Sequence, residues 1–124
     1  MALSDPIIEG LVAALLAVNS YPVARVQAVV PSLRSALLLQ PLDVAAMDIG
    51  SITVRLAEAG YDRGYLTGML AERLQALMTR VATGELDALE DAISHGDEAK
   101  FTKLLRTVRG IGPRVAGIAW DLLS

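Results

Sequence analysis

The chain has 124 residues, a length typical of one domain, and we expect a single helical domain over residues 1–124. Hydrophobic residues make up 53% of the chain and aromatic residues only 4%, so aliphatic side chains must build the core. The absence of cysteine and the single histidine, His95, exclude disulfides, thiol nucleophiles and Cys- or His-rich metal sites. We predict no metal site and no bound cofactor.

The first apolar stretch, residues 11–18, is too short to cross a membrane, because a span needs about 20 uninterrupted apolar residues. Asp5 and Glu9 precede this stretch, where a signal peptide would carry basic residues. We therefore expect a cytoplasmic protein with no membrane contact. The high apolar share also predicts that a partner subunit or a second copy covers part of the surface.

Proline and polar breaks divide residues 5–47 into short segments whose apolar residues recur at helical spacing. Asp5 is expected to cap the first helix, with Pro6 at its first position. Pro31 is expected to end the second helix, because it lacks the backbone N–H that a helix interior needs. The predicted helices run from residue 6 to a stop near 19–22, over 23–30 and over 32–39, with a short helical turn over 41–47.

Glycines mark the ends of the next helices, at Gly60, Gly84 and Gly96. Asp62 is expected to cap the longest helix, and Asp97 a later one. The predicted helices cover 51–59, 62 to about 82, 85–94, 98–108 and 113–123. No segment has the alternation of a strand, so the predicted fold class is all-α, a compact multi-helix domain.

The net charge of −3 hides a strong asymmetry near the C-terminus. Residues 85–98 contain six acidic side chains and no Lys or Arg. Residues 99–120 contain five basic side chains and no acid, namely Lys100, Lys103, Arg106, Arg109 and Arg114. The basic segment is therefore a candidate anion-binding surface.

The turn Gly110-Ile111-Gly112 lies within this basic segment, directly before Pro113 opens the last helix. Glycines allow a sharp turn without a Cβ clash, and Ile111 is expected to point inward and fix the hairpin. The turn and the first turn of the helix expose unpaired N–H groups, which together form a site for a phosphate. Such backbone contacts position a protein on DNA without reading its sequence.

Residues 108–116, Val-Arg-Gly-Ile-Gly-Pro-Arg-Val-Ala, resemble the helix-hairpin-helix of the DNA glycosylase superfamily that includes endonuclease III and the adenine glycosylase MutY. Residues 11–19 are similar to the early core helix of that family, with Asn19 in the place of a family Gln. Residues 43–47, 52–59 and 60–70 are similar to the two short helices and the Gly-aromatic turn that follow. The resemblance implies a glycosylase-like helical domain with its hairpin at 98–123.

The resemblance also implies DNA binding, and a monovalent cation held by the hairpin carbonyls. Lyase-type members carry a catalytic Lys where this chain has Arg114, whose guanidinium stays protonated and cannot form a Schiff base. The family's catalytic Asp lies about twenty residues beyond the hairpin, and Asp121 comes too early to match it. We therefore predict a non-catalytic, DNA-repair-related protein that binds the DNA backbone without strong sequence preference. Its predicted binding residues are Lys103, Arg106, Arg109, Gly110, Ile111, Gly112 and Arg114.

Three other interpretations stay open at this stage. An ordinary helix–turn–helix connection would also use glycines for tightness. A minimal glycosylase or nuclease component would need a carboxylate on the hairpin side, with Asp62 and Asp121 as candidates. A protein-interaction subunit that has lost DNA contact would explain the acidity and the apolar surplus. Tyr61 is expected to brace its turn, and Tyr65 to pack against the core.

Overall fold

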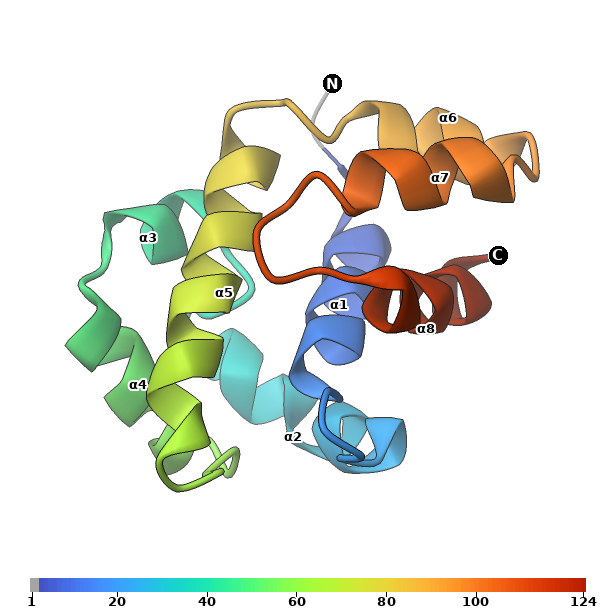
Figure 1. Cartoon of the computed structure of the whole chain (residues 1–124). Helices are drawn as coiled ribbons and strands as arrows, with labels where there is room; N and C mark the ends of the chain where they lie inside the picture. Colours follow the sequence, from blue (N-terminus) through green and yellow to red (C-terminus); the bar gives the residue numbers. More distant parts are fainter. Residues whose placement is uncertain (1–2) are drawn as a thin grey trace.

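The computed structural model describes residues 3–124, which form eight α-helices and no strand (Figure 1). The all-helical fold class predicted from the sequence is therefore confirmed. The helices are α1 (Asp5–Leu16), α2 (Val23–Ser35), α3 (Pro41–Ala46), α4 (Ile49–Glu58), α5 (Leu66–Ala82), α6 (Ala88–Ser94), α7 (Glu98–Leu105) and α8 (Pro113–Leu123).

Helix α1 forms the centre of the molecule. Every residue from Leu11 to Leu16 is buried, which is the pattern of a helix that other elements surround on all sides. It packs against α2, α5 and α8. Figure 1 shows α1 between a group formed by α3, α4 and α5 and a second group formed by α6, α7 and α8. Helix α1 thus joins the two groups through its apolar surface.

Helix α2 differs from the prediction, because it continues through Pro31 as far as Ser35. Val30 and Leu33 are buried on either side of the proline, while Pro31 itself is exposed. The free energy gained by burying Val30 and Leu33 therefore outweighs the loss of one helical hydrogen bond at Pro31. Pro31 lies on the exposed face of the helix, where water can reach the backbone. The Ser35 hydroxyl donates to the Pro31 carbonyl at 3.1 Å. The two helices expected over 23–30 and 32–39 are therefore replaced by the single helix α2.

Several further boundaries differ from the prediction. Ser4 rather than Asp5 is the N-cap residue of α1, and α6 begins at Ala88 rather than at residue 85. Asp62 does not cap α5, because its carboxylate accepts from the Gly64 N–H at 2.9 Å and forms a local turn. Helix α4 begins earlier than expected, since the Asp48 carboxylate accepts from the Ser51 N–H at 2.8 Å. Helix α7 begins after Asp97 as predicted but ends at Leu105 rather than at residue 108.

Tyr61 fastens the α4–α5 connection to the end of α1. Its buried hydroxyl donates to the Leu16 carbonyl, and Arg63 donates to the Val18 carbonyl at 2.9 Å. These two side chains satisfy carbonyl groups that the end of α1 leaves unpaired. The bracing role expected for Tyr61 is confirmed. Tyr65 does not pack as expected, because 94% of it is exposed.

Across residues 3–124, no helix combines the length and the apolar character that crossing a membrane requires.

Replacing Tyr61 by Phe should destabilise the fold. The Tyr61→Phe change leaves the buried Leu16 carbonyl without its donor, a loss worth about 1–3 kcal/mol. Urea denaturation at neutral pH measures the difference in free energy of unfolding. An unchanged midpoint would contradict the bracing role of the hydroxyl.

The same residue should make stability sensitive to alkali. Burial raises the pKa of Tyr61 above its usual value of 10.0. Below pH 10 the hydroxyl is protonated in both states, and above it the unfolded chain ionises first. Stability should therefore fall as the pH rises from 10 through the raised pKa of the folded state. Denaturation series from pH 8 to about 11 should show a smaller loss for Tyr61→Phe than for the parent chain.

Replacing Pro31 by Ala should stabilise the fold, because it restores the N–H that a helix interior uses. The expected gain in the free energy of unfolding is about 1–3 kcal/mol. Pro41→Ala is the matched control, since Pro41 lies in the first turn of α3, where no N–H bond is lost. Thermal unfolding of both variants measures the effect, and a Pro31→Ala variant less stable than its parent would contradict this account.

Candidate nucleic-acid interface

The connection between α7 and α8 is a turn of residues 106–112, which Figure 1 shows running toward α5. Val108 and Ile111 are buried, and the Ile111 N–H donates to the Val108 carbonyl at 3.1 Å. The inward position expected for Ile111 is confirmed. These two apolar side chains hold the turn against the body of the molecule and leave the residues around them exposed.

The two glycines of the turn serve different purposes. Gly110 has a φ of +87°, in the left-handed region that glycine occupies without strain. A Cβ atom at Gly110 would lie 2.7 Å from Cδ of Arg73, which crosses the turn from α5. Gly112 has an ordinary φ of −101°, and a Cβ there would meet nothing within 4 Å. Gly110 therefore shapes the turn, whereas Gly112 keeps the approach to α8 open.

The start of α8 leaves backbone donors without partners within the described part of the fold. Gly112 is the N-cap residue and Pro113, which has no N–H, is the first helical residue. Within residues 3–124, the N–H groups of Gly112, Arg114 and Val115 make no hydrogen bond, and no side chain caps the helix. The N–H groups of Arg114 and Val115 lie in the first turn of α8, so they point out of the helix start together with the positive end of the helix dipole, as an anion site requires.

The predicted basic residues all reach the surface, but they lie on different sides of the turn. Lys103 and Arg106 line a hollow of about 680 Å³ beside α7. Arg109 lines two hollows between the turn and α5. Arg114 is exposed on the first turn of α8. None of the four forms an ion pair within the described part of the chain, so their charges are free to attract an anion.

Helix α5 contributes residues to this surface that the sequence analysis did not select. Met69, Arg73, Ala76 and Arg80 lie on one face of α5, at spacings of four, three and four residues, and line the hollows beside the turn. Arg73 is half-buried against Gly110, and its guanidinium makes no hydrogen bond or ion pair with any described residue. The helical spacing was visible in the sequence, but nothing in it indicated that this face meets the hairpin.

Arg80 ties the hairpin to α5. It donates to the Thr107 carbonyl at 3.2 Å and to the Thr107 hydroxyl at 3.0 Å, and it pairs with Glu85 at 3.1 Å. The Thr83 hydroxyl donates to Glu85 at 2.7 Å, and the Thr107 hydroxyl donates to a carbonyl of α7. This Arg80 network fixes where α7 ends and therefore where the turn begins.

The carboxylates considered for catalysis do not line this surface. Asp62 is engaged in its own turn with Gly64, and Asp121 lies on the last turn of α8, about 12 Å along the helix axis from Pro113. The acids that line the hollows beside the turn are Glu72 of α5 and Glu98 of α7. No group of three acidic or histidine side chains able to hold a metal ion occurs among residues 3–124, including the acidic run of α6.

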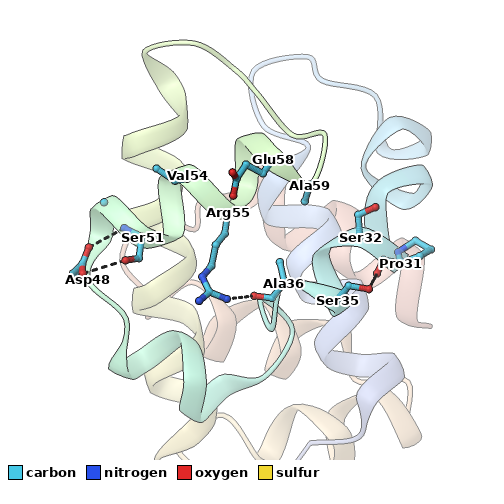
Figure 2. Close-up of a pocket in the computed structure, with 11 residues that line it drawn as sticks. Pro31, Ser32, Ser35, Ala36, Asp48, Ser51, Val54, Arg55, Glu58 and Ala59 are labelled. Carbon is cyan, nitrogen blue, oxygen red and sulfur yellow. Dashed lines mark hydrogen bonds between the residues drawn. The ribbon is translucent and has the colours of Figure 1, made fainter.

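A larger hollow, of about 1000 Å³, lies between α2 and α4 (Figure 2). Arg55 crosses it and donates to the Ala36 carbonyl at 2.9 Å, which satisfies the end of α2. The Asp48 carboxylate accepts from the Ser51 N–H and hydroxyl, and these bonds lower the pKa of Asp48. Arg55 and Asp48, which line this hollow, therefore already have partners within the fold, whereas Lys103, Arg106, Arg109 and Arg114 have none among the described residues.

The two turn glycines should respond differently to substitution. Gly110→Ala places a side chain in the left-handed region and against the Arg73 stem, and should lower the free energy of unfolding by about 1–3 kcal/mol. Gly112→Ala meets open space and should change it by less than about 0.5 kcal/mol. Urea denaturation of both variants measures the difference, and equal effects would contradict the distinct roles.

Comparison with protein-family models, with curated proteins and with solved structures finds no significant match to this chain.

Proposed function

We propose that this chain is a DNA-binding protein of the helix-hairpin-helix type, with residues 98–123 as the hairpin. The start of α8 binds one phosphate of the DNA backbone, and the surrounding Lys and Arg side chains bind the neighbouring phosphates of the same strand. The contact carries no strong sequence preference, because backbone donors meet only phosphate oxygens. The protein is non-catalytic in this proposal, and repair of DNA is the process that its resemblance suggests.

The observation that carries this proposal is the set of unpaired N–H groups at Gly112, Arg114 and Val115. An internally bonded turn could not receive an anion, whereas these N–H groups have no partner among the described residues. Pro113 and Arg114 are exposed at this helix start, Gly112 is partly exposed and Val115 is buried. A phosphate there gains charge-assisted hydrogen bonds and the favourable end of the α8 dipole.

The arrangement of cations around the turn supports a polyanion rather than a single small anion. Arg114 is itself one of the donor residues, and Arg109 lies three residues before Gly112. Lys103 and Arg106 extend the positive surface to the end of α7. Arg73 adds a guanidinium from α5. A polymer with regularly spaced phosphates can contact several of these groups at once, and each contact releases counterions from the DNA.

The mismatch at the positions where the resembling family carries its catalytic Lys and Asp supports a binding role over an enzymatic one. Arg114 stands where the resembling lyases carry their nucleophilic Lys, and a guanidinium cannot form a Schiff base. Asp62 and Asp121 lie away from the surface that would meet DNA.

A second copy or a partner subunit stays a prediction drawn from the apolar composition, and sizing chromatography with and without DNA tests it.

Combining Gly112→Val with Arg114→Glu should abolish DNA binding. The valine covers the approach to the donors, the glutamate repels phosphate, and the open space beside Gly112 lets the variant fold. Fluorescence anisotropy with labelled duplex DNA, from about 50 to 200 mM salt, measures affinity and its salt dependence. The parent chain should bind with affinity that falls steeply as salt rises.

Arg25→Glu is the control, because it makes the same charge change at an exposed position of α2, outside the hairpin. It should retain most of the affinity. Circular dichroism verifies that all three chains are folded. The proposal fails if the double variant binds as tightly as the parent, or if the folded parent chain binds no DNA at low salt.

A further inference from the structure

The solvent-facing side of α7 carries charges of opposite sign at its two ends. Phe101 and Leu105 are buried on the inner side, where α7 packs against α6 and α8 (Figure 1). The residues of the other side line the hollow of about 680 Å³, and we call them the α7 outer face: Glu98, Ala99, Thr102, Lys103, Arg106 and Thr107. Its acid lies at the start of the helix, and its two cations lie toward the end.

These charges find no partner within the fold. Glu98, Lys103 and Arg106 form no ion pair with any residue from 3 to 124. Their spacing is one reason, because side chains on a helix meet at separations of three or four residues. Lys103 follows Glu98 by five residues and Arg106 follows it by eight, which is about 12 Å along the axis. A partner for each charge must therefore come from another molecule.

A second copy of this chain offers the matching charges. Thr102 lies four residues after Glu98 and four residues before Arg106. If two α7 helices pack antiparallel about a two-fold axis beside Thr102, the Glu98 of each copy lies opposite the Arg106 of the other. The same arrangement brings the positive dipole end of each helix to the negative end of its neighbour. Two equal ion pairs then form, one at each end of the interface.

The middle of the α7 outer face allows this close approach. Ala99 and Thr102 have short side chains, and the surface is hollowed where they lie. Packed helices have axes about 8–10 Å apart, with the distance set by the side chains at the crossing. A polymer of phosphates suits only the basic half of this face, because Glu98 would repel it. The whole face is therefore better matched by its own copy than by DNA.

We propose that the α7 outer face binds the same face of a second copy, in an antiparallel dimer with two Glu98–Arg106 ion pairs. The inference goes beyond the proposed function and requires no DNA. A helix of eight residues buries far less than the roughly 1,200 Å² of a standard stable interface, so the dimer is weak and reversible. Because Arg106 takes part in both contacts, DNA and a second copy compete for it.

Sedimentation velocity of the full chain, from about 10 µM to 1 mM protein, measures this association at about 10 mM and about 1 M salt. The parent chain should form dimers at the higher concentrations in low salt. Raising the salt should weaken the association about tenfold or more, because the screening length falls from about 30 Å to about 3 Å.

Two charge reversals test the pairing itself. Glu98→Arg places like charges at both ends of the dimer, and so does Arg106→Glu. Each variant alone should associate at least about tenfold more weakly than the parent, since the symmetry repeats every repulsion. An equimolar mixture of the two variants should regain the association of the parent, because each introduced charge meets its opposite on the other variant. Mixing would not rescue variants that had merely lost their fold.

Glu58→Arg is the matched control, because it makes the same charge change at an exposed position of α4, outside this face. It should associate as the parent does, and circular dichroism verifies that every variant is folded. The inference is overturned if the parent chain is monomeric at about 1 mM in low salt, or if the mixture associates no better than its components. Since no DNA enters the experiment, neither result bears on the proposed function.

Discussion

The burial of the second half of α1 on every side is the constraint on which the rest of the structure depends. Its residues from Leu11 to Leu16 are almost entirely aliphatic, so no face of this helix can meet water without a large loss of free energy. Three helices, α2, α5 and α8, pack against it as a result. Helix α8 follows the hairpin turn directly, and Arg73 of α5 packs against that turn. The proposed binding surface therefore depends on a core helix that contributes no residue to it.

Local signals predicted much of the fold. Gly60, Gly84 and Gly96 each adopt a positive φ at the end of a helix, and Asp97 caps α7, because these features depend only on neighbouring backbone atoms. The prediction that Pro31 ends the second helix was wrong for a physical reason. The burial of side chains on both sides of it is a tertiary effect that outweighs a local backbone preference.

In the candidate site, too, the features that depend on neighbouring residues were predictable from the sequence, and those that depend on tertiary packing were not. The turn residues, the inward Ile111 and the exposed basic side chains were predicted from the sequence, because they lie within one short basic segment. Arg73 and Glu72 were not, since they lie more than thirty residues before the turn and only the packing of α5 brings them to it. Their charges give the surface a mixed character that the basic segment alone does not have.

The Arg80 network has a consequence for how this chain can vary in length. It links α5, the connection at residues 83–87 and Thr107 through side chains with fixed reach. An inserted residue in that connection would displace Glu85 from Arg80 and shift the end of α7 with it. Insertions and deletions should therefore be excluded from residues 83–87, so that the spacing between α5 and α7 stays constant.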